Sequence, residues 1–338
     1  MVEPRFLVVR LGSLGDIVHT FPAVAGLRAS FPGAEIVWLT HPRWRTLVES
    51  SGLATETWEV ESRSRVSVRE ILARIRSRHF SAAIDYQGLW KSAVLPFLAR
   101  VPQRIGFSSR TIREFGVPIL YTKRVRCKTT HIADQNGELS QCAGAQNGVA
   151  GFQVSVPAVH EAFVMQLLLG FSIDRYVVLS PAGGWRSKCW PADRYGALCQ
   201  KIRTELGLRC IVNYGPGEQE FAMAVKAASG EAEPVAYNGS LVQLMALLRN
   251  ALCVVGGDTG PLHLAVASKT PVVALFGPTD PARNGPYPAQ ESREKVIVLR
   301  SANARTTHKR GAEADSSLLE LDVASVFEAV RSQIEKHR

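Results

Sequence analysis

The sequence has no long hydrophobic run, and this limits the kind of protein it can be. Its apolar stretches, such as 177–179 and 271–276, are far shorter than the roughly 20 residues of a membrane-spanning helix. The apolar run 6–9 is followed at once by Arg10, which is not the pattern of a secretory signal peptide. With 46% hydrophobic and 21% charged residues, the 338-residue chain is typical of a globular protein of about two domains. We expect a cytoplasmic protein.

The signatures of common cofactor and metal sites are also missing. No GxGxxG turn follows a predicted strand and no GxxxxGK[S/T] loop occurs, which argues against NAD binding and P-loop ATP hydrolysis. The six cysteines form no CxxC pair and no Cys/His cluster with zinc spacing, so we expect buried or incidental thiols. There is no DxD pair to hold a metal–diphosphate. The sequence therefore predicts no cofactor and no metal.

Acidic residues are scarce in one part of the chain. The net charge is +10, of which residues 1–150 carry +8 and residues 151–338 carry +2. Within the first half, residues 63–128 hold 15 basic and 3 acidic side chains. Such a concentration of positive charge attracts an anionic partner, which can be a nucleic acid, an acidic membrane surface or an acidic substrate. A solvated basic surface without a partner is the other interpretation.

Strand and helix patterns alternate along the chain, which predicts parallel α/β sheets covered by helices on both faces. Strands are predicted at 6–9, 35–40, 82–85 and 105–107, and again at 177–180, 210–214, 253–255 and 272–276. Helical spacing predicts helices at 17–27, 66–78, 191–206, 219–228, 241–249, 261–268 and 323–334. The stretch 133–175 is less regular, and we place a linker near 150–175.

The two α/β runs predict two domains, residues 1–160 and 161–338, that face a central cleft. Such a cleft suits an enzyme with two substrates. The position of the final helix is open, because it can also pack back onto the N-terminal domain.

The first loop that could carry chemistry is the turn 12–16, Gly-Ser-Leu-Gly-Asp, between the first strand and the first helix. Glycines let the backbone turn tightly and approach a ligand, and open α/β sheets bind ligands outside the carboxyl ends of their strands. Asp16 lies at the start of the helix, where the helix dipole favours its ionised form. Asp16 is therefore either a helix cap or a general base that faces the cleft.

Three loops of the second half have the composition of a phosphate or nucleotide site. The loop 256–263, Gly-Gly-Asp-Thr-Gly-Pro-Leu-His, leads into a helix whose N-terminus can bind an anion. Arg186 and Lys188 follow Gly183 and Gly184 in a loop that can reach the same phosphate. Gly215 precedes Glu218 and Glu220, either of which could accept hydrogen bonds from a ribose.

Taken together, these motifs resemble glycosyltransferase family nine, the lipopolysaccharide heptosyltransferases. The matching segments are 12–20 (GSLGDIVHT), 85–92 (DYQGLWKS), 188–191 (KCWP), 258–263 (DTGPLH) and 276–280 (FGPTD). They occur in the order of the family and span nearly the whole chain. The segment 85–92 resembles heptosyltransferase I more than heptosyltransferase II. The segments 130–150, rich in Gly, Ala and Asn, and 301–313 depart from the usual pattern.

The resemblance implies a GT-B fold, with two Rossmann-like domains that bind the acceptor in the N-terminal half and the nucleotide sugar in the C-terminal half. It implies an ADP-heptose donor, a Kdo–lipid A acceptor, inversion at the anomeric carbon, and a peripheral place at the cytoplasmic face of the inner membrane. No nucleic acid is expected as a partner.

The expected roles of single residues combine the resemblance with the loops described above. Asp16 would be the catalytic base. The donor phosphates would be held by Lys188, Asp258, Thr259, Gly260 and His263, with Arg186. The nucleotide would contact Gly183, Gly184, Gly215, Glu218 and Glu220, although the family alignment places Gln219 opposite the ribose-binding acid. The acceptor would contact Ser13, Gly15, Gln87, Lys91, Arg74, Arg78 and His131.

Three other functions are weighed against this one. A family-nine transferase with a different sugar or acceptor would share all the motifs. A non-catalytic binder of anionic polymers or membranes would explain the basic segment but not the phosphate loops, and segment 63–78 lacks the aromatics of a single-strand binder. A nucleotide-sugar epimerase or dehydrogenase would need the missing GxGxxG turn.

Overall fold

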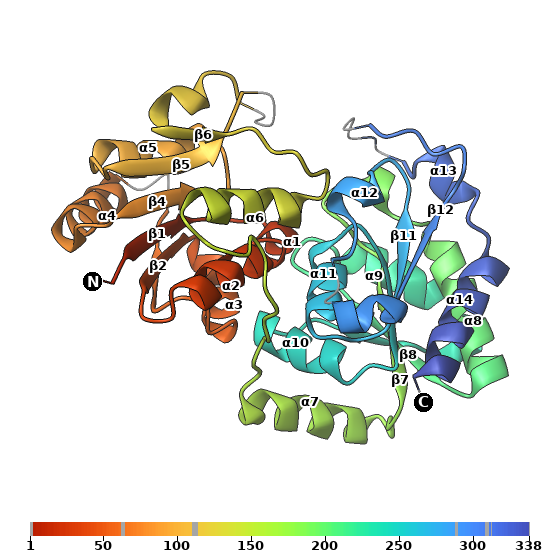
Figure 1. Ribbon diagram of the computed structural model, residues 1–338. Coiled ribbons are helices and arrows are strands. Elements are labelled where there is room, and N and C mark those ends of the chain that lie inside the picture. Colours follow the sequence, from red (N-terminus) through yellow and green to blue (C-terminus); the bar gives the residue numbers. More distant parts are fainter. Residues whose placement is uncertain are drawn as a thin grey trace. The chain divides into compact units, whose positions relative to one another are not determined.

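A computed structural model describes residues 3–61, 65–109, 114–287, 290–307, 311 and 313–337 of the chain. The chain divides into two compact units, Met1–Ser155 and Val156–Arg338 (Figure 1). The predicted boundary between 160 and 161 falls inside a helix that belongs to the second unit.

The N-terminal unit is built on a six-stranded sheet in which every pair of neighbours is parallel. The order is β3-β2-β1-β4-β5-β6, so the chain starts in the middle of the sheet and builds outward in both directions. The strands are β1 Arg5–Val9, β2 Glu35–Thr40, β3 Glu56–Glu59, β4 Ala82–Asp85, β5 Gln103–Phe107 and β6 Lys123–Val125.

Helices cover both faces of this sheet because its central strands are apolar on both sides. On one face, Leu7, Val9 and Val37 pack with Ile71 and Ile75 of the helix before β4. On the other face, Phe21 packs edge-on against Trp38, with ring centroids 5.8 Å apart. The helices are α1 Leu14–Val18, α2 Phe21–Ser30, α3 Arg45–Ser50, α4 Arg65–Arg78, α5 Trp90–Leu98 and α6 Ile132–Cys142, with 3-10 turns η1 Pro42–Trp44 and η2 Val117–Leu120.

The C-terminal unit repeats the same architecture. Its six parallel strands have the order β12-β11-β10-β7-β8-β9, which is the same topology read from the other edge. The strands are β7 Tyr176–Ser180, β8 Arg209–Asn213, β9 Val235–Tyr237, β10 Cys253–Gly257, β11 Val272–Phe276 and β12 Val296–Arg300.

The helices of the C-terminal unit enclose this second sheet. They are α7 Ala158–Gly170, α8 Ala192–Leu206, α9 Gln219–Ala228, α10 Leu241–Arg249, α11 Gly260–Ala267, α12 Pro281–Asn284, α13 Ser316–Leu319 and α14 Val323–Lys336, with 3-10 turns η3 Arg186–Lys188, η4 Gly230–Ala232 and η5 Gln290–Lys295. Val326 and Val330 of the final helix, α14, are buried in the core that α8 forms with β10 and β11. The helix therefore packs within its own unit.

Two helices occupy the stretch that we expected to be irregular. The linker predicted near 150–175 contains α7, and α6 lies at 132–142 in the segment rich in Gly, Ala and Asn. The composition of this segment has a packing reason. A Cβ on Gly26 of α2 would lie 2.6 Å from the carbonyl oxygen of Asn147, and one on Gly137 of α6 would lie 3.0 Å from the backbone of Gly148. The glycines allow α2, α6 and the loop at 147–149 to approach each other closely.

Candidate active site

Each sheet has one point at which the strand order reverses, and ligands of open α/β sheets bind outside the carboxyl ends of the strands at this point. In the N-terminal unit the reversal lies between β1 and β4, where Val9 pairs with Asp85. In the C-terminal unit it lies between β7 and β10, where Ser180 pairs with Gly256. The loops that follow these four strands contain most of the residues that the sequence singled out.

The loop after β1 holds Asp16 in the first turn of α1. The backbone N–H of Ser13 donates to Oδ2 of Asp16 over 3.1 Å and the Ser13 hydroxyl donates over 2.9 Å. Gly12 permits this turn, because its φ is +155° and a Cβ there would lie 2.8 Å from the Trp44 indole nitrogen. Asp16 therefore does cap the start of its helix, as one of the two interpretations held.

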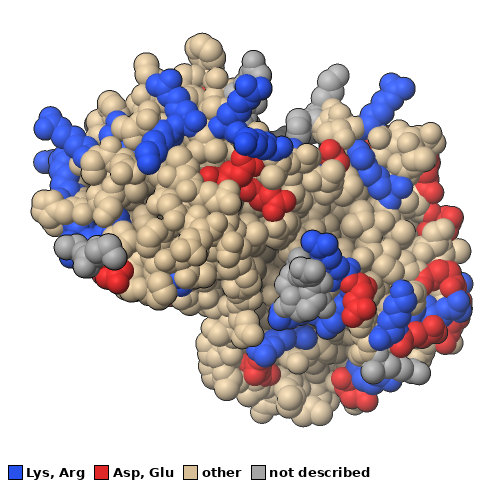
Figure 2. All heavy atoms as spheres, viewed as in Figure 1, with Lys and Arg blue, Asp and Glu red and all other residues tan. Residues whose placement is uncertain are grey.

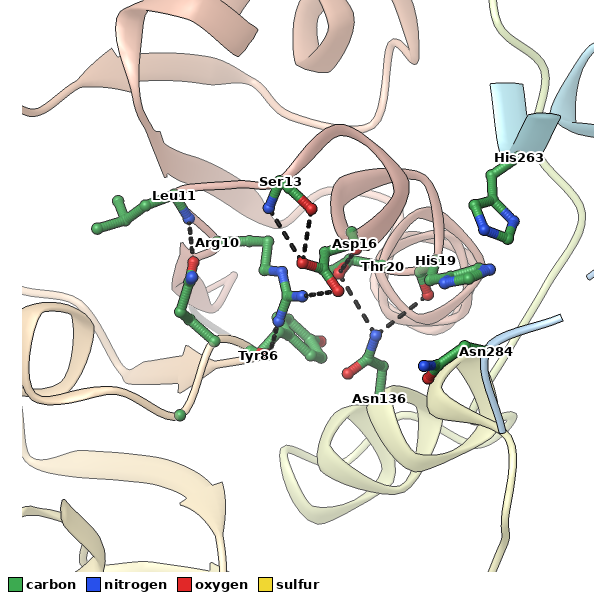
Figure 3. A network of polar contacts seen from close by, with 12 residues as sticks. Arg10, Leu11, Ser13, Asp16, His19, Thr20, Tyr86, Asn136, His263 and Asn284 are labelled. Carbon is green, nitrogen blue, oxygen red and sulfur yellow. Dashed lines mark hydrogen bonds and ion pairs between the residues drawn. The ribbon is translucent and has the colours of Figure 1, made fainter. Parts of the chain in front are cut away.

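A buried arginine holds the other oxygen of the same carboxylate. Arg10 Nη2 lies 2.7 Å from Asp16 Oδ1, and Arg10 Nη1 donates to the carbonyl oxygen of Tyr86 in the loop after β4 (Figure 3). The Arg10 side chain is only 7% exposed, whereas that of Asp16 is 44% exposed. The carboxylate is thus fixed in position and still open to a reactant, which a cap alone does not require.

The buried carboxyl group of Asp85 anchors the loop after β4. Asp85 accepts hydrogen bonds from the N–H groups of Gln87 and Gly88 and from the hydroxyls of Ser92 and Tyr121. Burial raises the pKa of Asp85, and these four donors oppose the rise. The loop held in this way places Oε1 of Gln87 2.7 Å from the N–H of Leu11.

Helix α6 supports the loop after β1 from another side. The Asn136 amide donates to the carbonyl oxygen of His19, 3.1 Å away, at the end of α1 (Figure 3). His131 caps the start of α6 with its Nδ1, and its ring meets that of His19 edge-on at 5.3 Å. Ser13, Gly15, Gln87 and His131, predicted to bind the acceptor, thus lie in or beside the loops around Asp16.

The other predicted acceptor residues lie apart from Asp16. Lys91 is exposed in the first turn of α5, after the β4 loop. Arg74 and Arg78 belong to α4, which ends at the amino edge of the sheet, opposite Asp16. There Arg78 pairs with Glu35 over 2.9 Å and with Glu56, while Arg74 stacks on the Trp58 ring at 4.1 Å. The structure does not bring these two arginines to the candidate site.

The C-terminal unit contains a cluster centred on Asp258, directly after β10. Lys188 Nζ lies 2.6 Å from Oδ2 of Asp258, and His263 Nε2 lies 3.1 Å from Oδ1. All three side chains are largely buried. Burial by itself would raise the pKa of Asp258, but the hydrogen bond from His263 and the Lys188 ammonium hold that pKa well below its usual range. The Asp258 carboxylate therefore orients the Lys188 ammonium and the His263 ring at the start of α11.

The start of α11 has the features of an anion site. Thr259 is its N-cap residue and Gly260 its first residue, so the first N–H groups and the positive end of the helix point out of this end. The Thr259 hydroxyl is buried and has no hydrogen-bond partner among the described residues. Gly183 lies against it, because a Cβ there would be 3.4 Å from the Thr259 methyl group. Lys188, Asp258, Thr259, Gly260, His263 and Gly183 are therefore brought together.

The remaining predicted donor residues lie in the loops after β7 and β8. The Arg186 guanidinium lies 5.1 Å from the centre of the Phe221 ring, and a Cβ on Gly184 would meet nothing within 4 Å. Glu218 uses its Oε2 to accept the N–H of Gly215 over 2.7 Å, whereas Glu220 is exposed in the first turn of α9. Within the described residues, no group of three His, Cys, Asp or Glu side chains could hold a metal ion.

Sequence reasoning missed the roles of Arg10, Asp85 and Asn136, which orient the site. Of these three, only Asp85 lies in a motif that the sequence had singled out, 85–92. Arg10 had a detectable signal in the sequence, because a charged residue directly follows an apolar strand. The structure shows that this arginine lies in the hydrophobic interior. Asn136 had none, since a polar residue in a helix is usually exposed.

Comparison with known proteins decides the family. The sequence model of glycosyltransferase family 9 (heptosyltransferase) matches residues 68–315, well over half of the chain. The chain belongs to glycosyltransferase family 9. It is therefore a glycosyltransferase of the heptosyltransferase type, as the sequence motifs predicted.

Curated relatives of this family member are named for heptose transfer in lipopolysaccharide synthesis. The chain is 27% identical over 318 residues to lipopolysaccharide heptosyltransferase 1 of Escherichia coli K12, which covers 88% of this chain and 97% of the relative. It is 23% identical over 281 residues to lipopolysaccharide heptosyltransferase 3 of the same strain, covering 79% of this chain and 80% of the relative.

Solved structures confirm the fold. A family 9 glycosyltransferase from Veillonella parvula superposes with a TM-score of 0.86 at 21% identity, covering 99% of this chain and 98% of that one. An E. coli heptosyltransferase solved with ADP gives a TM-score of 0.75 at 24% identity, covering 97% of this chain and 99% of that one. The two Rossmann-like parallel-sheet units are those of the GT-B fold. In the part of the chain that the structure describes, we find no helix with the length and hydropathy of a membrane span.

Proposed function

We propose that this family 9 enzyme transfers heptose from ADP-heptose to the Kdo residue of Kdo–lipid A, with inversion and without a divalent metal. The observation that carries the proposal is the match to lipopolysaccharide heptosyltransferase 1 over nearly the full length of both chains. The ADP in the solved relative supports an adenosine diphosphate leaving group. The protein would work in the cytoplasm, at the surface of the inner membrane that holds the acceptor.

In the proposed reaction, Asp16 acts on the acceptor. The acceptor hydroxyl attacks the anomeric carbon, the bond from that carbon to the diphosphate breaks, and the hydroxyl proton passes to the carboxylate. Arg10 and Ser13 fix the two oxygens of Asp16, so the base does not have to be oriented during the reaction. Because the hydroxyl becomes more acidic as the new bond forms, a carboxylate is a strong enough base for a late proton transfer.

On the donor side, the proposal assigns the departing charge to the Asp258 cluster. The diphosphate gains negative charge as the glycosidic bond breaks, and a cation and a helix N-terminus aimed at it stabilise the transition state. Lys188 supplies the cation, and Asp258, which also holds His263, orients it beside the start of α11. These groups would replace the metal ion that a DxD-type enzyme uses.

A direct assay tests the proposal. The protein would be incubated with ADP-heptose and Kdo–lipid A, and ADP release and the mass of the lipid product would be measured. Asp16→Asn is expected to lower turnover by roughly 10²–10⁴-fold, as the loss of a general base does, while the melting temperature and ADP affinity change little. Near-normal turnover in a folded Asp16→Asn variant would show that Asp16 only caps its helix.

A different acceptor for the same reaction is the alternative that a specific observation supports. The relatives include heptosyltransferase 3 at a similar level of identity, so the same chemistry on an acceptor that already carries heptose fits the comparisons too. Offering heptosylated and heptose-free Kdo–lipid A in separate reactions distinguishes them. A clear preference for the heptosylated lipid would replace the proposed acceptor and leave the reaction type in place.

A further inference from the structure

One surface of the N-terminal unit exposes large apolar side chains that the proposed reaction does not use. On α5, Trp90, Phe97 and Leu98 share one face of the helix at i, i+7 and i+8, and each is more than two-fifths exposed. On the neighbouring turn η2, Ile119 is 70% exposed, and Phe115 just before the turn is 99% exposed. We call these five residues the α5–η2 patch.

The two segments of the patch are joined by specific contacts. At one end, the indole N–H of Trp90 donates to the carbonyl oxygen of Phe115 over 3.2 Å. At the other end, Arg104 donates from Nε to the carbonyl oxygen of Leu120 over 2.8 Å, and its guanidinium lies 5.5 Å from the centre of the Phe97 ring. The exposed side chains therefore sit on a connected and supported surface.

Positive charge surrounds the patch. Arg76, Arg100 and Arg104 line a shallow depression together with Phe97 and Leu98, and Arg76 donates to the carbonyl oxygen of Leu98. Of the described residues in 90–109 and 114–128, only Glu114 is acidic, whereas seven are Lys or Arg. Figure 2 shows Lys and Arg side chains standing over this part of the N-terminal unit, around α5, β5 and β6.

Apolar side chains inside a basic rim match an anionic lipid surface better than other occupants. Exposed apolar groups lower the free energy when they enter the boundary of the acyl chains. Nearby cations lower it further when they approach the lipid phosphates. A second copy of the chain would bring the same basic rim against itself in a two-fold dimer, which is repulsive. A nucleic acid would use the arginines but would leave Leu98 and Ile119 exposed to water.

We propose that the α5–η2 patch is the surface by which this enzyme docks on a bilayer containing anionic phospholipid. The inference builds on the proposed function, since an acceptor anchored in a membrane gives the enzyme a reason to dock there. The docking itself does not depend on the identity of the sugar or of the acceptor.

Sedimentation of the full-length protein with vesicles tests the proposal. The vesicles would contain phosphatidylcholine alone or phosphatidylcholine with about 30% phosphatidylglycerol, whose surface attracts basic side chains. We expect binding to the anionic vesicles only.

Replacing Phe115→Ser and Ile119→Ser together should lower the partition coefficient at least about tenfold, because two exposed apolar side chains no longer enter the bilayer. Replacing Arg76→Gln and Arg100→Gln together should lower it by about tenfold at low salt and little at about 0.5 M salt, where exposed charges are screened.

Matched control variants come from the C-terminal unit. Val159 and Met165 are exposed apolar residues of α7, and Arg203 and Lys226 are exposed basic residues of α8 and α9. Replacing the first pair by serine, or the second pair by glutamine, should leave vesicle binding unchanged. Circular dichroism and the melting temperature would confirm that every variant is folded.

Several results would overturn the proposal. These are an equal loss of binding in the control variants, unchanged binding in both patch variants, binding of a single-stranded oligonucleotide that the patch variants lose, or a dimer in solution that the Phe115→Ser/Ile119→Ser variant dissociates. Turnover with a deacylated, water-soluble acceptor separates this test from that of the reaction. If the patch variants keep that turnover but lose vesicle binding, the docking surface is supported. If no transfer occurs with any variant but the vesicle results hold, the proposed reaction is wrong and the docking surface stands.

Discussion

Arg10 links the candidate base to the rest of the N-terminal sheet. It is the first charged residue after a buried strand, and its guanidinium contacts the Asp16 carboxylate and the Tyr86 carbonyl at once. A buried guanidinium needs such partners, because an unpaired charge in the interior is costly. The same pair of contacts ties the loop after β1 to the loop after β4 and therefore fixes the geometry of both.

Replacing Arg10 tests whether this positioning matters for turnover. We expect Arg10→Gln to lower kcat about 10- to 100-fold, since a loosely held base reacts less often in the right geometry. The effect on kcat should nearly vanish when Arg10→Gln is added to Asp16→Asn, because residues that act as a unit are not additive. Steady-state kinetics of the two single variants and the double variant measure this. If the two effects simply multiply, Arg10 does not act through Asp16.

The lowered pKa of Asp258 predicts that the free energy of unfolding depends on pH. Its pKa is lowered in the folded protein by His263 and Lys188 despite its burial, so the unfolded chain binds a proton more readily. The resulting stabilisation is complete at neutral pH, above the unfolded pKa of about 3.9, and declines as the pH falls toward the lowered value, by up to about 1.4 kcal/mol per pH unit.

The Asp258→Asn variant should lose this pH dependence. At pH 7 we expect the variant to be less stable by about 3–5 kcal/mol, the usual effect of removing one partner of a buried ion pair. The difference from the wild type should shrink as the pH is lowered below about 4. Urea unfolding of both proteins from acid to neutral pH measures it, and Asp174→Asn on the exposed surface is the control. A constant difference across this range would contradict the assigned cause.

At the level of elements, alternation of strands and helices predicted the architecture of both sheets, and the loops at the strand reversals were found from their glycines and polar residues. Several of the elements that were missed have a physical reason. Strands β3 and β6 lie in the outer part of the sheet, are short and carry charged residues, so they lack an apolar run. Helix α7 is apolar almost all round and shows no helical period, although only Val164 and Leu168 are buried.

Helix α6 escaped prediction because its buried face consists mostly of small or polar residues, with Leu139 as its one large apolar side chain. Such a surface gives no apolar stripe in the sequence, and its purpose is visible only when α2 and the loop at 147–149 are in place. The buried Asn136 has the same origin, since its partner, the carbonyl oxygen of His19, lies 117 residues earlier in the chain.

The close approach of α2 to the loop at 147–149 reverses the usual effect of a helical glycine. Alanine is favoured over glycine in a helix by about 1 kcal/mol, but a Cβ at Gly26 would meet two carbonyl oxygens at 2.6 and 2.7 Å. We expect Gly26→Ala to lower the free energy of unfolding by about 1–3 kcal/mol through overpacking. Gly151→Ala is the control, because nothing lies within 4 Å of its Cβ. Chemical denaturation measures both, and a stabilised Gly26→Ala protein would mean that the loop moves away at little cost.

At the level of the whole molecule, charge and chemistry are divided between the two units. The first half carries most of the net positive charge, +8 of +10, and the loops that we propose to bind phosphate lie in the second half. The ion pairs of Arg74 and Arg78 at the amino edge of the first sheet show that the basic segment does not all serve the site at Asp16. Arg76 and Arg100 of this segment are exposed and lie beside the α5–η2 patch, which would give this charge a partner other than the acceptor sugar.

This division predicts which unit ADP stabilises and where it slows hydrogen exchange. A ligand that binds only the folded form stabilises it by RT ln(1 + [L]/Kd), which is about 2.7 kcal/mol at a concentration of 100 Kd. If ADP binds at the start of α11, this gain belongs to the C-terminal unit. Hydrogen exchange should slow in the loop 181–188 and around 257–263, and the transition of the C-terminal unit should move upward on heating. Lys188→Ala should reduce both effects, whereas Asp16→Asn should leave them unchanged. Protection centred on the loops around Asp16 and Gln87 would instead place the nucleotide in the N-terminal unit and reverse the proposed roles of the two units.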